Sequence, residues 1–177
     1  MHWRSRLGWI FARRCLVGLM VGMSLIGSVQ AQYQKSPWHQ KLPVPAQEWV
    51  DVSGKSWGRS QLHGKAVVIN FWATWCAPCL EELPSLQTFL EFTQGMDVVV
   101  LTINVKDPLN RIHPFVARNG FTFPVVSDRQ GVMARQWGVK VFPTTVLLSA
   151  QGKPVWVIEG PVDWASREAG EWIRGLR

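Results

Sequence analysis

Short apolar runs and helically spaced leucines alternate along the middle of the chain. Residues 66–72 and 97–105 are mostly apolar and rich in β-branched side chains. Their length and composition do not suit helices, and they predict strands buried on both faces. Between them, residues 77–94 carry leucines at a spacing that faces one side of a helix toward a core. The order strand, helix, strand predicts a parallel crossover and an α/β fold.

Weaker patterns extend this unit on both sides. Residues 32–45 are polar, contain prolines and show no periodicity, which indicates a linker or N-terminal arm. Asp107 and Asp163 each stand where they would cap a helix, the second of these helices being the last element. The other predicted elements are a hairpin over residues 49–57, helices over residues 107–119 and 131–137, and a hairpin of residues 144–149 and 154–159 that gives the sheet an antiparallel edge.

The first 31 residues have the pattern of an export signal. Arginines precede an apolar stretch over residues 15–29, and no acidic residue accompanies them. The stretch is shorter than the roughly 20 residues that span a bilayer, and it ends in small residues that suit cleavage after Ala31. We therefore expect a signal peptide over residues 1–31, with an uncleaved membrane anchor as the alternative. Either leaves the domain over residues 46–177 in the periplasm or another extracytoplasmic space.

Removing this segment changes the charge of the protein. The whole chain has a formal net charge of +7, but residues 32–177 hold 15 basic and 12 acidic side chains, a net charge of +3. A nucleic-acid or anionic-membrane role thereby loses its main support. The remaining 146 residues suit one domain with a sizeable core.

Two cysteines carry the candidate chemistry. Cys15 lies in the predicted leader, so Cys76 and Cys79 are the cysteines of the mature chain, in a C-x-x-C directly after a predicted strand. A disulfide between them closes too short a loop to add much stability. A closed zinc site is not available to two cysteines alone. Redox exchange explains the pair better than an inert disulfide or half of a metal site.

The sequence around these cysteines resembles that of the thioredoxin superfamily. The run NFWATWCAPC at residues 70–79 and the later FPTT at residues 142–145 carry the resemblance. CLEELP at residues 79–84 and NGFTFPV at residues 119–125 are similar to the TlpA/ResA-like exported thiol–disulfide oxidoreductases. The resemblance implies a thioredoxin fold, in which helices flank a central mixed β-sheet, with an N-terminal hairpin and a central insertion.

Roles for the two cysteines follow from the start of a helix. Cys76 is expected at or before the first turn, where free backbone N–H groups and the macrodipole favour an anion. Such sites lower a cysteine pKa from about 8.5 to roughly 3.5–7.5, which makes Cys76 the expected nucleophile. Cys79, one turn further and more buried, would resolve the mixed disulfide.

Glu82 is a candidate proton carrier. It lies three residues after Cys79, near the same helix face, where burial would raise its pKa and let it act as general base and acid toward that thiol. Thioredoxins usually place a buried aspartate in the preceding strand, and Asn70 stands at that position here. Glu82 is therefore expected to replace that function, while Glu81 is expected on a solvated face.

Three further residues are candidates for holding a substrate. The resemblance implies that Pro143 has a cis peptide bond, which would present the Phe142 backbone to an extended peptide next to Cys76. Phe142 is bulkier than the small residue often found there. Trp75, flanking the cysteine, is expected to be partly exposed and to offer an apolar surface to a partner.

The resemblance also implies partners and a direction. Substrates would be cysteine pairs of exported proteins, with disulfide reduction of the cytochrome c maturation type and a membrane thiol-transfer protein as electron donor. We expect a monomer that needs no organic cofactor or metal and binds no nucleic acid. The alternatives are a thiol peroxidase, for which residues 74–76 lack the P-x-x-x-T-x-x-C context, and a Cu(I) chaperone using both thiols as soft ligands.

Overall fold

The computed structural model describes residues 33–38 and 48–177. The predicted signal peptide and most of the remaining linker, residues 39–45, lie outside the described residues. Among the residues that are described, no helix is long and apolar enough to cross a membrane.

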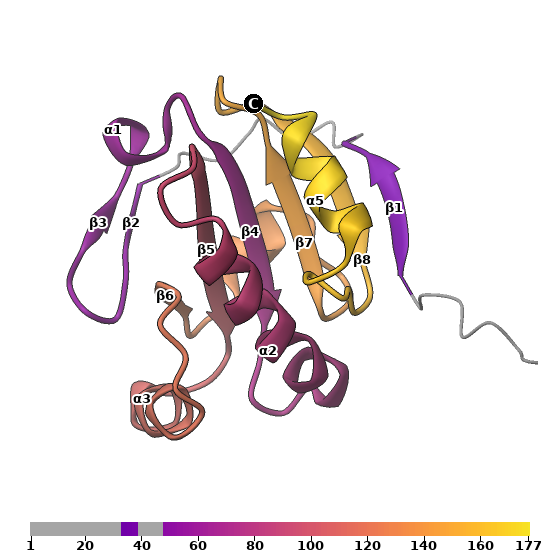
Figure 1. Cartoon of the computed structure of the whole chain (residues 1–177). Helices are drawn as coiled ribbons and strands as arrows, with labels where there is room; N and C mark the ends of the chain where they lie inside the picture. Colours follow the sequence, from indigo (N-terminus) through magenta and orange to yellow (C-terminus); the bar gives the residue numbers. More distant parts are fainter. Residues whose placement is uncertain (1–32, 39–47) are drawn as a thin grey trace, which may run out of the picture. The chain divides into compact units, whose positions relative to one another are not determined.

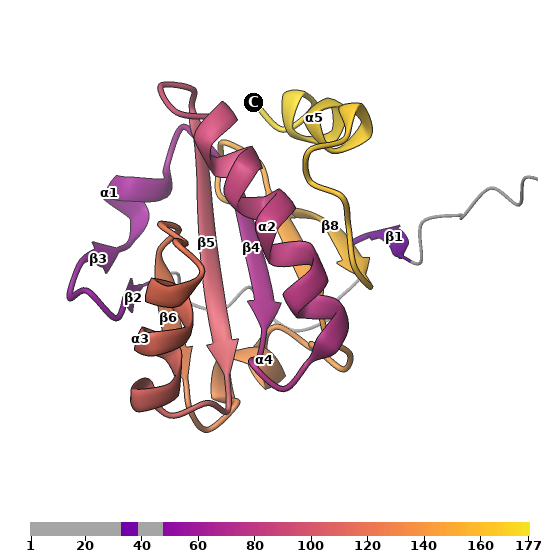
Figure 2. The same cartoon turned by 60° about the horizontal axis from the view of Figure 1, so that its bottom comes forward.

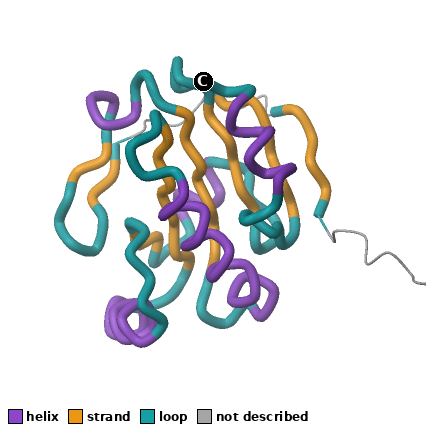
Figure 3. Tube along the Cα trace, in the orientation of Figure 1, coloured by secondary structure: helices purple, strands orange, loops and turns teal. Residues whose placement is uncertain are grey.

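A mixed β-sheet forms the centre of the described domain (Figures 1 and 3). Its strands β4 and β5 run parallel, as do β5 and β6, whereas all other neighbours are antiparallel. Every residue of β4 is buried, which confirms the predicted central strand. In spatial order the strands are β1 (Gln34–Pro37), β8 (Pro154–Glu159), β7 (Thr144–Leu148), β4 (Ala66–Trp72), β5 (Val98–Val105) and β6 (Val125–Asp128).

Helices cover both faces of this sheet because alternate side chains of each strand point to opposite sides. Val68 of β4 joins a core cluster that contains residues of α2, α3 and α5. Its neighbours Val67 and Ile69 join a second cluster, with residues of α1 and α4. The views in Figures 1 and 2 show α2 and α5 over one face. The helices are α1 (Arg59–Leu62), α2 (Ala77–Phe92), α3 (Leu109–Arg118), α4 (Val132–Gln136) and α5 (Arg167–Arg174).

The predicted N-terminal hairpin is confirmed as β2 (Trp49–Val50) and β3 (Ser56–Trp57). Asp51 stabilises its turn, since its carboxylate accepts hydrogen bonds from the Trp57 indole at 2.8 Å and from the Ser53 backbone at 2.8 Å. The predicted C-terminal hairpin is confirmed as β7 and β8. The residues predicted as a central insertion, 119–125, lie between α3 and β6, and β6 extends the parallel part of the sheet.

The prediction of a linker or arm without a helix or strand over residues 32–45 is wrong for part of that range. Gln34–Pro37 forms β1 and pairs antiparallel with β8. An uncovered β8 would expose a row of backbone hydrogen-bonding groups, and β1 satisfies them despite its polar sequence. The Lys35 ammonium lies 3.9 Å from the centroid of the Trp156 ring on β8, which adds a cation–π contact.

Both predicted helix caps are also wrong. Pro108 precedes the first residue of α3, and the Asp107 side chain binds elsewhere. Ser166 caps α5 by accepting a hydrogen bond from the Ala169 N–H, so this helix begins later than predicted. Asp163 instead stabilises the preceding loop by accepting from the Ala165 N–H at 3.0 Å.

Candidate active site

Cys76 and Cys79 lie at the N-terminus of α2, directly after the buried strand β4. They form a disulfide with Cα atoms 5.3 Å apart. Cys76 is the N-cap residue of α2, and its Sγ accepts a hydrogen bond from the Cys79 N–H at 3.3 Å. The predicted helix position is confirmed, and Cys79 is the more buried of the two, at 0% against 5% exposed. Backbone N–H groups at this helix start would stabilise a Cys76 thiolate once the disulfide is reduced.

The surface beside the disulfide is aromatic. Trp75 is 54% exposed, which confirms its predicted exposure. Its ring packs edge to face against Phe142, with centroids 5.6 Å apart. The Phe142–Pro143 peptide bond is cis, as the resemblance implied. The structure thus brings the predicted substrate-binding residues to the loop that carries Cys76.

Glu82 lies one turn after Cys79 on α2 and is 3% exposed. The Trp164 indole N–H donates to its Oε1 at 2.5 Å, and Asn70 Nδ2 lies 3.4 Å from its Oε2. The same Asn70 amide donates to Thr145 Oγ1 at 3.0 Å. A polar network therefore connects α2 to β4, to β7 and to the segment before α5. Trp164 was missed in the sequence because nothing local marks a residue 82 positions away as a partner of Glu82.

Burial controls the ionisation of Glu82. Loss of hydration raises its pKa from 4.5 to about 7, although the hydrogen bonds from Trp164 and Asn70 favour the carboxylate and oppose that rise. Glu81 is exposed, as predicted. A pocket of about 230 Å³ beside α2 offers Glu82 a short route to water, and its other lining residues are Glu81, Ser85, Pro161, Val162 and Asp163. Glu82 can therefore both hold and exchange a proton near neutral pH.

Asp107 is a second buried carboxylate that sequence reasoning placed wrongly. Its Oδ2 accepts from the Thr74 N–H at 2.7 Å and from Asn104 Nδ2 at 3.0 Å, while its Oδ1 accepts from the Thr74 hydroxyl at 2.7 Å. These bonds clamp the turn before Cys76, whose own N–H donates to the Ala73 carbonyl at 3.2 Å. A carboxylate suits this position because every group facing it is a donor.

We expect Asp107→Ala to destabilise the oxidised protein by about 2 kcal/mol, because it removes the acceptor of the Thr74 N–H and of the buried Asn104 amide and leaves these donors without a partner. Urea unfolding would measure the change. The matched control is Arg111→Gln, since that guanidinium is 61% exposed and 3.7 Å from Asp107, a contact worth little. Equal effects of the two substitutions would contradict the clamp.

No group of three or more His, Cys, Asp or Glu side chains able to hold a metal ion lies within the described residues. The pair Cys76 and Cys79 would be the soft ligands if the reduced protein bound Cu(I).

Comparison with known proteins places these features in a family. Residues 40–157 match the AhpC/TSA family. Thiol-disulfide oxidoreductase ResA of Geobacillus thermodenitrificans is 37% identical over 110 residues, which cover 62% of this chain and 63% of that protein. The chain thus spans less than two thirds of the length of this relative.

Solved structures show the same fold. StoA from Bacillus subtilis has a TM-score of 0.63 at 27% identity, covering 73% of this chain and 97% of that one. A secreted thiol-disulfide isomerase from Corynebacterium glutamicum has a TM-score of 0.68 at 28% identity, covering 80% and 90%. The predicted thioredoxin fold and the resemblance to ResA-like proteins are confirmed, and relatives of this chain are named thiol-disulfide oxidoreductases. The chain belongs to the AhpC/TSA family of thioredoxin-like proteins.

Proposed function

We propose that this protein is a thiol–disulfide oxidoreductase that reduces disulfides of exported proteins with its Cys76 and Cys79 thiols. The observation that carries the proposal is the placement of Cys76 at the start of α2. An exposed aromatic surface lies beside it, and the buried Glu82 follows on the same helix. Nucleophile, resolving thiol and proton carrier then follow one another along a single helix.

In the proposed reaction, the Cys76 thiolate attacks one sulfur of the substrate disulfide. A mixed disulfide forms, and the other substrate sulfur leaves as a thiolate. Glu82 accepts the proton of Cys79, whose thiolate attacks the Cys76 sulfur, closes the protein disulfide and releases the second substrate thiolate. Protons from Glu82 and water complete the two substrate thiols. Two electrons have moved to the substrate, and a membrane thiol-transfer donor would return the protein to its dithiol form.

Location is inferred from the first 31 residues, and the substrate class from the resemblance to ResA-like proteins. The pattern of residues 1–31 supports export by a signal peptide or anchor, and a structural relative is named as secreted. Exported proteins with cysteine pairs, including those of cytochrome c maturation, are the substrate class that the resemblance to ResA-like proteins supports. The exposed Trp75 ring and the Phe142 backbone would hold an extended segment of such a substrate.

Equilibration of the protein with glutathione mixtures tests the direction of electron flow. Known dithiol proteins span roughly −270 to −120 mV, and a reductase is expected toward the reducing end. A potential near −120 mV would overturn the reducing direction. The same reduced protein should reduce a peptide disulfide faster than it consumes hydrogen peroxide; the opposite result would favour a thiol peroxidase. Tight stoichiometric Cu(I) binding with negligible exchange would favour a copper chaperone.

A further inference from the structure

We propose that Trp164 is a positioning residue, whose indole N–H holds Glu82 in the orientation in which it takes a proton from Cys79. The proposal deepens the function proposed above and rests on it. Trp164 lies between β8 and α5, outside every motif that carried the resemblance. Within the described part of the chain Trp164 hydrogen-bonds to neither cysteine, so it would act through Glu82.

The hydrogen bond between the two side chains is buried. Trp164 Nε1 is 2.5 Å from Glu82 Oε1, whereas the Asn70 amide is 3.4 Å from Oε2 and is shared with Thr145. Trp164 is 1% exposed, so water does not compete for this bond. The Val162 backbone also hydrogen-bonds to Glu82, but of these partners the indole lowers the pKa of the carboxyl group most.

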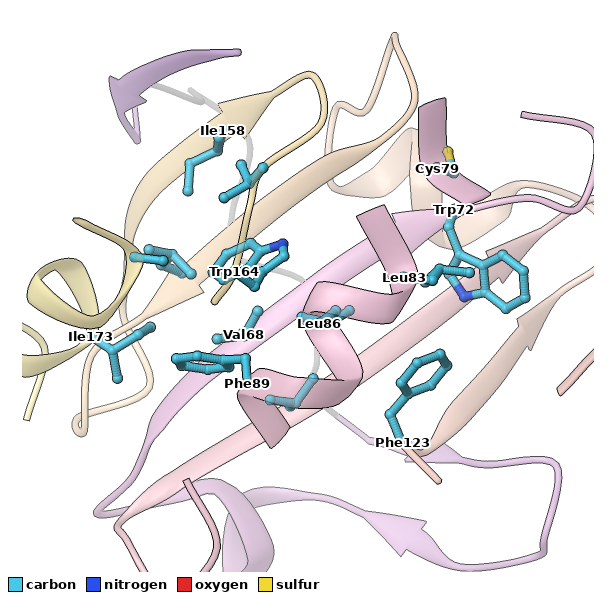
Figure 4. Close-up of a cluster of buried hydrophobic side chains, with 14 of the residues drawn as sticks. Val68, Trp72, Cys79, Leu83, Leu86, Phe89, Phe123, Ile158, Trp164 and Ile173 are labelled. Atoms are coloured by element: carbon cyan, nitrogen blue, oxygen red, sulfur yellow. The ribbon is translucent and has the colours of Figure 1, made fainter. Parts of the chain in front are cut away.

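The indole ring has little freedom to turn away from Glu82. Its centroid lies 5.7 Å from that of Phe89 on α2 and 6.4 Å from that of Trp172 on α5. The Trp164 backbone N–H donates to Ser85 Oγ at 3.1 Å, which ties the residue to α2 next to Glu82. Figure 4 shows Trp164 and Phe89 within the cluster that packs α2 against the sheet. The position of the donor is set by packing on three sides.

An indole N–H suits this task because it donates a hydrogen bond and cannot accept one or supply a proton. The bond favours the carboxylate, which is the form that accepts a proton from Cys79. Because Oε1 accepts the hydrogen bond from Trp164, the proton taken from Cys79 is better held on Oε2. A phenylalanine would keep an aromatic ring in the cluster and remove this donor, and the packing that its smaller ring gives up is matched in the control variant Trp172→Phe.

The surroundings of Glu82 supply no competing cation among the described residues. The charged side chains that share its pocket are Glu81 and Asp163, both acidic. The strands contribute the neutral Asn70 and Thr145, and the Val162 backbone adds a further hydrogen bond to Glu82. Hydrogen bonding is therefore the means by which the protein counters the burial of this carboxylate.

Trp164→Phe tests the proposal, with Trp172→Phe as the matched control. Trp172 is also a packed tryptophan of this cluster but makes no recorded contact with Glu82. The Glu82 ¹³Cδ resonance can be assigned by its loss in Glu82→Gln, and its pH titration measures the proton affinity of Glu82. We expect that affinity to rise about tenfold in Trp164→Phe, which moves the titration midpoint to higher pH, and to stay unchanged in Trp172→Phe. The midpoint of the pH–rate profile for disulfide exchange should rise by the same factor.

The two measurements separate failure of this inference from failure of the proposed function. An unchanged Glu82 midpoint in Trp164→Phe overturns the inference even in a protein that exchanges disulfides. A raised midpoint supports the contact even if the native substrate is not a disulfide. A raised midpoint with a uniformly slower, unshifted rate profile overturns the role in exchange. In the Glu82→Gln background, Trp164→Phe should cause no further change in the pH dependence of the rate.

Discussion

Replacing Cys79 with serine is expected to stop turnover and leave the substrate attached to Cys76 through a stable mixed disulfide. The first attack needs only the Cys76 thiolate, which the helix start still stabilises in this variant. Release needs the second sulfur, and a serine hydroxyl does not reduce a disulfide. Multiple-turnover exchange should fall by about a thousandfold or more, as for the loss of an essential nucleophile. Non-reducing electrophoresis and mass spectrometry would detect the adduct.

Cys76→Ser is the matched control for this experiment. Cys79 is wholly buried in the oxidised protein, so it should form no adduct with a protein substrate. An adduct carried by Cys79 in place of Cys76 would contradict the assignment of nucleophile and resolving thiol. Both variants should unfold at similar denaturant concentrations, because each lacks the same disulfide and that disulfide closes a very short loop.

The parts of the fold that were predictable from the sequence are those whose signal is local. β4 could be predicted because a short run of apolar, β-branched residues is typical of a buried strand. The position of Cys76 at a helix start followed from the turn and helix pattern around it. Glu82 was placed by its spacing from Cys79 along one helix, and Trp75 by its position directly before Cys76.

The parts that were not predictable depend on contacts between distant segments. β1 has a polar sequence and becomes a strand only because the edge of β8 is available to it. Asp107 follows a strand and precedes a proline, as a helix cap would, yet its carboxylate binds Thr74, 33 positions earlier. Trp164 is one of many tryptophans in the chain, and only the packed structure distinguishes it from the others. Chemistry that is built from such pairs leaves no spacing to detect.

The second large effect is expected from Glu82→Gln. Glutamine keeps the shape and an acceptor for the Trp164 indole but cannot take a proton, so the release step should slow by about a hundredfold or more. In the wild type, the rate should rise with pH as Glu82 ionises with a pKa of about 7. In the variant this dependence should be absent. Stopped-flow exchange with a peptide disulfide between pH 5.5 and 8.5 would measure both effects, and identical profiles would contradict the role of Glu82.

Glu82→Gln slows exchange, but it should make the folded protein more stable than the wild type as pH rises. Burial raises the pKa of Glu82 from 4.5 to about 7, so between these pH values the unfolded chain has already lost a proton that the folded protein still holds. The free energy of unfolding of the wild type therefore falls as pH rises from about 4.5 to about 7, by an amount on the order of 3 kcal/mol, and this contribution is constant at higher pH. Glu82→Gln has no such loss, because glutamine does not titrate. Urea unfolding of the oxidised proteins, in which the cysteines do not titrate, should show the variant gaining this amount on the wild type across that range. Parallel curves would mean that Glu82 is hydrated in solution. A gain in stability together with a loss of exchange would identify Glu82 as a group kept for its proton at the expense of the fold.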